Sequence, residues 1–206
     1  MYLTMPNTIS LFRIIASPLF LILMLNKDKE SIILAYILFV LAAISDYLDG
    51  WYARKFNVET SLGRFFDPLA DKILTTSAFL LFVYLDIIPT WIFMVIIIRD
   101  VIATIMRVYA DFVKIYMRTS FLAKLKTAFQ MICVVMILTL ILIKSTGLFG
   151  LNPVKINNIL YSGFTYYSIV LLTIFSFWTL LEYIFQNKTL IIHFWSGISK
   201  KKFVNE

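Results

Sequence analysis

The amino-acid sequence predicts an all-α, polytopic membrane protein with six transmembrane helices. Hydrophobic residues make up 61% of the 206 positions and the mean hydropathy is +0.87, whereas a soluble domain is about half apolar. Charged residues make up 15% and lie between long apolar runs, as expected because one charge at the centre of a transmembrane helix costs roughly 2.5–3.5 kcal/mol. Water is therefore not the main solvent of this chain.

The apolar runs are long enough to cross a bilayer, which takes about 20 residues per helix. We expect helices near residues 8–26, 31–54, 67–88, 89–112, 120–144 and 156–186, which together form a single membrane domain over residues 1–206. Turn and charge signals mark the short joints, for example at residues 26–30 and 147–153. The first run lacks the cleavage site of a signal peptide, so we expect it to remain as a helix, kinked near Pro18.

Basic residues are divided unequally between the two predicted membrane faces. One face carries Arg54, Lys55, Arg64, Lys114, Arg118, Lys188, Lys200, Lys201 and Lys202, and the other carries Lys27, Lys29, Lys144 and Lys155. The richer face is expected to be cytoplasmic, with both termini there, in a multi-pass protein of the inner membrane. The net charge of +7 comes without a basic domain outside the apolar segments, so we expect anionic membrane lipids as partners and no nucleic acid.

Two residue types that often build metal sites are nearly absent. The chain has one cysteine, Cys133, and one histidine, His193, which excludes an intrachain disulfide, a thiolate cluster and a histidine metal site. The chemistry must therefore come from carboxylates, lysines and arginines.

Four aspartates gather where the second predicted helix ends and the third begins. Asp46 and Asp49 follow a long apolar run, and Asp67 and Asp71 open the next helix, where Pro68 suits a first turn. Residues three or four apart share a helix face, so each pair of carboxylates points one way. Both pairs are predicted to lie at the cytoplasmic side of the membrane.

Carboxylates gathered in this way repel one another unless cations neutralise them. Oxygen ligands without histidine or cysteine favour Mg²⁺, Mn²⁺ or Ca²⁺ over zinc, and a pair of such ions can clamp both sides of a phosphoryl displacement. The pattern therefore predicts a phosphate-handling metal site. The alternative is structural, with the acids capping helices or pairing with Arg54, Arg64 and Lys72.

From Asp46 the sequence reads D-x-x-D-G-x-x-A-R, followed after eight residues by G-x-x-x-D-x-x-x-D, which ends at Asp71. This resembles the complete signature of the CDP-alcohol phosphatidyltransferases. The resemblance implies a homodimeric enzyme in which an alcohol displaces CMP from a CDP-linked lipid. It further implies two divalent ions, Mg²⁺ or Mn²⁺, on the four aspartates, with Asp71 as general base. The CDP-lipid site implied by the resemblance comprises Asn7, Asp49, Gly50, Ala53, Arg54 and Gly63.

Cations within the fourth and fifth predicted helices indicate an anionic acceptor. Arg99 lies inside an apolar stretch and Lys124 and Lys126 open the fifth helix, so all three could face the aspartates and bind a phosphate. Arg107 and Arg118 are weaker candidates for the same acceptor-phosphate site. Alternatively, Arg99 pairs with its neighbour Asp100 and the lysines mark the membrane interface.

The opening P-N-x-x-S-x-x-R, from Pro6 to Arg13, is similar to the P-N-x-x-T-x-x-R opening of bacterial phosphatidylglycerophosphate synthases, and F-x-D-P-x-A-D-K ending at Lys72 resembles another of their segments. This implies CDP-diacylglycerol and glycerol 3-phosphate as substrates. Asp100 stands where that group has Glu, and Ala123 where it has Gly. A cardiolipin synthase acting on phosphatidylglycerol, a phosphatidylinositol-phosphate synthase, an intramembrane prenyltransferase and a transporter remain alternatives.

Overall fold

The computed structural model describes residues 5–56, 61–113 and 121–188, with the side chains of residues 5–9, 46–56, 61–68 and 111 outside that description. These residues form seven α-helices and one short 3-10 helix, and no strand occurs among them. The bounds are α1 Met5–Leu25, α2 Lys29–Phe56, α3 Ser61–Tyr84, α4 Thr90–Phe112, α5 Phe121–Thr146, η1 Leu148–Gly150, α6 Pro153–Leu160 and α7 Gly163–Gln186. The all-α prediction is confirmed for this part of the chain.

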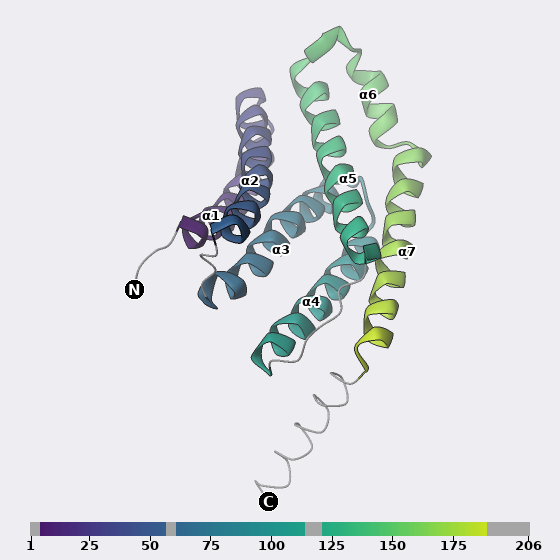
Figure 1. The fold of residues 1–206 in the computed structure, drawn as a ribbon. Coiled ribbons are helices and arrows are strands. Elements are labelled where there is room, and N and C mark those ends of the chain that lie inside the picture. The colour runs from purple at the N-terminus through teal and green to yellow at the C-terminus, as the bar shows by residue number, and fades with distance from the viewer. Residues whose placement is uncertain (1–4, 57–60, 114–120, 189–206) are drawn as a thin grey trace, which may run out of the picture.

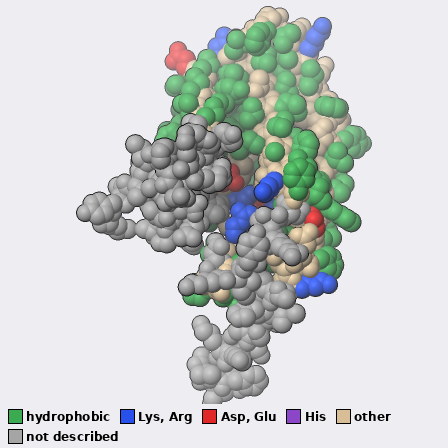
Figure 2. Space-filling model, in the orientation of Figure 1, with side chains coloured by type: hydrophobic (Ala, Val, Ile, Leu, Met, Phe, Trp, Pro, Cys, Tyr) green, Lys and Arg blue, Asp and Glu red, His purple; other side chains and the backbone are tan. Residues whose placement is uncertain are grey.

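Two stretches among the described residues are long and apolar enough to cross a membrane. They are α5, Phe121–Thr146, and the run Pro153–Gln186 that contains α6 and α7, while Ser10–Leu25 within α1 is a shorter apolar helix. Figure 2 shows hydrophobic side chains spread over much of the upper surface, with Lys and Arg at its upper edge and lower down. A surface of this kind suits a lipid solvent, and the protein is a membrane protein.

The first three helices pack into a tight group. One stripe of α1, including Ala16 and Phe20, is buried, and α1 contacts both α2 and α3 over much of its length. The rings of Phe20 and Phe39 lie 5.2 Å apart, and alanines such as Ala35 and Ala78 are fully buried between helices. Because lipid is as apolar as these side chains, close contact through small residues stabilises the group more than hydrophobic burial does.

Helix α3 begins at Ser61, six residues before the predicted start at residue 67. Pro68 therefore lies inside the helix and the prediction that it occupies the first turn is wrong. Proline removes one backbone N–H donor but does not prevent the residues before it from being helical. The other end lies at Tyr84 instead of residue 88, because Asp86 has a left-handed backbone with φ of 55°.

The last predicted helix, residues 156–186, is also wrong in part, since it contains a break between α6 and α7. Ser162 has extended backbone angles, φ −75° and ψ 157°, and its hydroxyl accepts a hydrogen bond from the Thr165 N–H. A serine at this position ends one helix and caps the next. Earlier in the chain, α5 ends where Gly147 adopts φ of 69°, the left-handed conformation common after a helix.

The helices run up and down so that their ends gather at two opposite sides of the molecule (Figure 1). The ends of α2, α4 and α7 and the starts of α3 and α5 point toward the lower side of the view, and the joint from α5 to α6 lies at the top. Segments distant in sequence, such as α5 and α7 or α4 and α7, are in contact. The lower side is therefore built from five helices, which bring the predicted site residues toward one another.

Candidate active site

A cavity of about 630 Å³ lies among α2, α3, α4, α5 and α7. Its charged lining consists of Asp71, Lys72, Arg99, Arg107 and Lys124. The predicted general base and three of the predicted acceptor-binding cations thus share one cavity, although they come from three helices. Figure 2 shows Lys and Arg side chains gathered below the apolar surface.

The aspartate pairs reach this region on α2 and α3. Asp46 and Asp49 lie in the second half of α2, and Asp67 and Asp71 lie in the first half of α3. Asp71 lines the cavity with a side chain that is 32% exposed. Ala43, one helical turn before Asp46, lines it from α2, so the cavity adjoins both helices that carry the motif.

Asp100 is the centre of an ion-pair network at the wall of the cavity. Its Oδ1 accepts hydrogen bonds from Lys126 Nζ at 2.7 Å and from Arg99 Nη1 at 2.8 Å. Its Oδ2 accepts one from Lys72 Nζ at 3.3 Å. The Asp100 side chain is only 8% exposed, and a carboxylate buried so deeply needs such partners. The network joins α3, α4 and α5.

Arg99 extends this network to α7. Its Nε donates to the backbone carbonyl of Ser176 at 3.3 Å and its Nη2 donates to Thr179 Oγ1 at 3.0 Å. The pairing of Arg99 with Asp100, considered above as a structural alternative, is therefore present. Arg99 also lines the cavity, so the structural contact and a contact with a ligand do not exclude each other.

The remaining predicted acceptor residues differ in their placement. Arg107 and Lys124 line the cavity and are exposed. Lys126 is not among the lining residues: its side chain is 0% exposed and its ammonium is bound to Asp100. Arg118 lies outside the described residues, so its position stays a prediction. Of the cations predicted to bind the acceptor, three are brought together with Asp71.

Lys72 is a cavity residue that was not predicted to bind the acceptor. Its ammonium lies 3.8 Å from Asp71 Oδ2 and 3.3 Å from Asp100 Oδ2, which places it between the candidate base and the network. Its position directly after Asp71 in the motif was the signal that could have found it. Thr104, Thr127 and Tyr183 also line the cavity, and Thr104 could have been noticed as the residue four after Asp100.

The residues implied at the CDP-lipid site lie in α1, α2 and α3, of which α2 and α3 contribute to the cavity lining. Asn7 lies in α1, while Gly50, Ala53 and Arg54 lie in α2 and Gly63 lies in α3. Their side chains are outside the described part of the structure, so their contacts stay predictions.

The donor set fits a hard divalent ion by its chemistry. Asp46, Asp49, Asp67 and Asp71 offer only carboxylate oxygens, which suit Mg²⁺ or Mn²⁺. No group of three or more Asp, Glu, His or Cys side chains that could hold a metal occurs among the described side chains, which include only Asp71 of the four. The fit therefore rests on donor type and on helix register, with the pairs three and four residues apart.

The cavity combines a carboxylate with a cluster of cations, a lining that suits a phosphate-bearing ligand. A family model described as CDP-alcohol phosphatidyltransferase matches residues 3–178, and the chain belongs to this family. It is a transferase of phospholipid biosynthesis that releases CMP from a CDP-linked substrate. The resemblance drawn from the motif is confirmed.

Relatives within the family are similar over half to about three quarters of their length. The CDP-diacylglycerol–glycerol-3-phosphate 3-phosphatidyltransferase of Bacillus subtilis is 39% identical, covering 63% of this chain and 74% of the relative. The protein of the same name from Rickettsia typhi is 35% identical, covering 62% of this chain and 71% of the relative. A CMP-forming cardiolipin synthase of Streptomyces coelicolor is 36% identical over half of each chain.

Proposed function

We propose that this protein transfers the phosphatidyl group of CDP-diacylglycerol to glycerol 3-phosphate, forming phosphatidylglycerophosphate and CMP. The observation that carries the proposal is the cavity in which Asp71 lies together with Lys72, Arg99, Arg107 and Lys124. A base is needed to activate the acceptor hydroxyl, and cations are needed to hold the acceptor's phosphate. The names of the relatives from Bacillus subtilis and Rickettsia typhi support this choice of substrates.

In the proposed reaction the acceptor hydroxyl oxygen attacks the phosphorus that carries diacylglycerol. The bond between that phosphorus and the oxygen bridging to CMP breaks, and CMP leaves with the bond's electron pair. The hydroxyl proton passes to the Asp71 carboxylate, which lines the cavity and is partly open to it. Lys72, beside Asp71, and the cations across the cavity hold the acceptor so that its hydroxyl faces the base.

Two divalent ions, Mg²⁺ or Mn²⁺, are proposed to be held by Asp46, Asp49, Asp67 and Asp71. When bound, they would neutralise the diphosphate and stabilise the charge that develops on departing CMP. Arg54 is proposed to contribute charge-assisted hydrogen bonds to the CDP group. The remaining CDP-lipid residues proposed are Asn7, Asp49, Gly50, Ala53 and Gly63.

We further propose six membrane spans within a single domain of residues 1–206, with α7 as the last span and α6 as a short helix at the membrane surface. The active site and both termini are placed on the cytoplasmic side of the inner membrane, where CDP-lipids, glycerol 3-phosphate and metal ions meet. The excess of Lys and Arg on that side supports this orientation. The functional unit is proposed to be a homodimer.

A cardiolipin synthase, which would use phosphatidylglycerol as acceptor, is the second candidate. The similarity to the Streptomyces coelicolor enzyme favours it. However, phosphatidylglycerol carries one negative charge on a phosphodiester, whereas glycerol 3-phosphate carries a phosphate monoester with about two. Four cations lining one cavity match the more highly charged acceptor better.

The test is CMP release by the purified full chain with Mg²⁺ or Mn²⁺, CDP-diacylglycerol and one acceptor at a time. The acceptors are glycerol 3-phosphate, phosphatidylglycerol, inositol phosphate and serine, and mass spectrometry identifies the lipid product. We expect phosphatidylglycerophosphate with glycerol 3-phosphate, and loss of activity after chelation that either metal restores. Cardiolipin as the product would transfer the assignment to the second candidate. If none of the four acceptors leads to CMP release, both candidate functions are contradicted.

A further inference from the structure

The Asp100 carboxylate has an unusual number of cationic partners for a buried group. Lys126, Arg99 and Lys72 bind it at 2.7, 2.8 and 3.3 Å, and these contacts occupy both of its oxygens. Asp71, 3.8 Å from Lys72, adds a second negative charge, so three cations face two carboxylates. Such an arrangement leaves a surplus of positive charge, which a bound anion would balance.

The three cations differ in what they can still reach. Lys126 is 0% exposed and forms the shortest contact, so Lys126 and Asp100 make a nearly neutral pair behind the cavity wall. Lys72 is 23% exposed and lines the cavity, as does Arg99. Because Lys126 already balances Asp100, Arg99 and Lys72 are left to act on the contents of the cavity, where Lys72 also lies 3.8 Å from Asp71.

The donor geometry of Arg99 agrees with this division. A guanidinium has five N–H donors, and three of its hydrogen bonds go to Asp100, Ser176 and Thr179. The Arg99 guanidinium, which lines the cavity, therefore keeps further N–H donors for a ligand while Asp100, Ser176 and Thr179 hold it in place. A cation fixed in this way loses little side-chain freedom when it binds an anion, which favours binding.

We propose that Asp100 is a positioning residue for the acceptor: it holds Lys72 and Arg99 at the cavity wall in the arrangement that binds the phosphate of glycerol 3-phosphate, while Lys126 neutralises it from behind. This rests on the proposed function and adds to it a residue that touches neither substrate. Asp100 therefore acts on acceptor binding through two other side chains, and it is not expected to act on the CDP-lipid.

The experiment measures CMP release by the purified full chain, varying glycerol 3-phosphate and CDP-diacylglycerol separately. In Asp100→Asn the KM for glycerol 3-phosphate is expected to rise about tenfold or more, and the KM for CDP-diacylglycerol to stay within about twofold. Asp100→Glu keeps the carboxylate and is expected to return the KM for glycerol 3-phosphate to within about threefold of the wild type. Asp86→Asn, an exposed site at the other side of the bundle, is the matched control and should leave both constants unchanged.

Loss of Asp100 also leaves Lys126 buried without its carboxylate, which could destabilise the fold. The double variant Asp100→Asn with Lys126→Met removes that buried charge. We expect it to recover the thermal unfolding midpoint and the monodisperse elution of the wild type, with the KM for glycerol 3-phosphate still raised. A purely structural role would restore that KM together with stability.

The proposal is overturned if the double variant binds glycerol 3-phosphate normally, or if both KM values rise equally. In either case the wild type still makes phosphatidylglycerophosphate, so the proposed function stands. If the wild type releases no CMP with glycerol 3-phosphate, the proposed function fails first and the role of Asp100 fails with it.

Discussion

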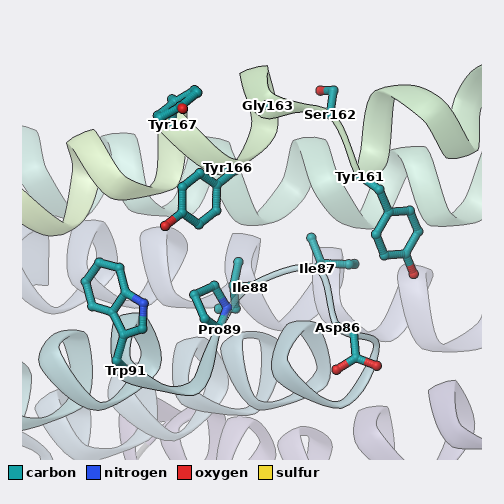
Figure 3. A pocket seen from close by; sticks show the side chains of 10 residues that line it. All are labelled: Asp86, Ile87, Ile88, Pro89, Trp91, Tyr161, Ser162, Gly163, Tyr166 and Tyr167. Atoms are coloured by element: carbon teal, nitrogen blue, oxygen red, sulfur yellow. The ribbon is translucent and has the colours of Figure 1, made fainter.

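The two sides of the helix bundle hold cavities of similar size and different chemistry. The cavity beside Asp71 measures about 630 Å³ and is lined by four cationic side chains. The pocket at the opposite side measures about 530 Å³, and its lining includes Trp91, Tyr161, Tyr166 and Tyr167 (Figure 3). That pocket lies where the turn between α3 and α4 meets the break between α6 and α7. Figure 3 shows the Tyr161 hydroxyl pointing down toward the α3–α4 turn.

The polar contacts of the two sides differ in how deeply they are buried. At the aromatic side, Tyr161 donates to the Leu85 carbonyl at 2.8 Å and Lys144 donates to Asn157 at 2.7 Å, both at exposed positions. At the other side, Asp100 and Lys126 are buried and join different helices. Tyr and Trp at a membrane–water interface anchor a protein there, while buried charges in a membrane usually serve function. The aromatic side therefore has the composition of an interface anchor, and the charged side has that of a functional site.

The largest expected effect is at Asp71. Replacing Asp71 with Asn keeps its size and removes the carboxylate that we propose accepts the acceptor's proton, so kcat should fall by about 10²–10⁴. The rate of CMP release at saturating substrates measures this. Asp86→Asn is the matched control on the aromatic side, since asparagine tolerates the left-handed backbone found there. An equal loss of kcat in Asp71→Asn and Asp86→Asn would contradict the conclusion that only the charged side serves the reaction.

Next in size is a pair of substitutions on one helix. Lys124 lies near the start of α5 and lines the charged cavity, whereas Lys144 lies near its end and contacts Asn157 and the Tyr161 ring. Lys124→Met should raise the KM for glycerol 3-phosphate by about three- to tenfold, because a charge proposed to contact the acceptor is lost. Lys144→Met should leave it within about twofold, and a similar rise in both variants would point to a general loss of charge as the cause.

Much of the charged side could be predicted from the sequence, because charges inside apolar runs are rare and therefore informative, whereas the aromatic pocket was not predicted. Arg99, Arg107 and Lys124 were predicted in this way and all line the cavity with Asp71. Lys126 shows the limit: it lies two residues from Lys124, yet it is fully buried. Side chains two residues apart on a helix point to opposite faces. Which of the two faces meets Asp100 depends on how α5 is rotated about its axis when it packs, and the sequence does not show that rotation.

The predicted helix boundaries were wrong where the local sequence signal was weak or ambiguous. Pro68 suits a helix start, but α3 begins at Ser61, because nothing before the proline interrupts the helix. The break at Ser162 and Gly163 lies inside an otherwise apolar run and has neither proline nor charge to mark it. The local signals there are the dipeptide Ser162-Gly163 and the Ser162 cap on the Thr165 N–H, and the hydrogen bond from Tyr161 to the Leu85 carbonyl adds a tertiary contact beside them.

A smaller effect is expected at the aromatic side itself. Tyr161→Phe removes only the hydroxyl that donates to the Leu85 carbonyl. The free energy of unfolding should fall by about 0.5–1.5 kcal/mol, the usual net contribution of one hydrogen bond. Thermal unfolding in detergent measures the change, and Tyr167→Phe, at an exposed ring, is the control. Kinetic constants should not change in either variant, and a loss of activity in Tyr161→Phe would link the two sides.

The smallest expected effect concerns Asp28, which precedes α2 on the aromatic side. The Ser31 backbone N–H donates to its carboxylate at 2.9 Å, and this bond, together with one from the Ser31 side chain, lowers the pKa of Asp28 from its ordinary 3.8. The contribution to stability is therefore complete above the unfolded pKa and is lost as the pH falls through the lower folded value. An NMR titration of the labelled carboxyl should give a midpoint below 3.8.

Two variants at Asp28 separate the charge from the hydrogen bond. Asn can still accept from the Ser31 N–H, so Asp28→Asn should keep the helix start while losing this acid-dependent part of the stability. Asp28→Ala should lose both. All three proteins should have the same KM for glycerol 3-phosphate, because Asp28 lies at the far side of the bundle from the charged cavity. A changed KM in the Ala variant alone would mean that the register of α2, and with it Asp46 and Asp49, depends on how the helix begins.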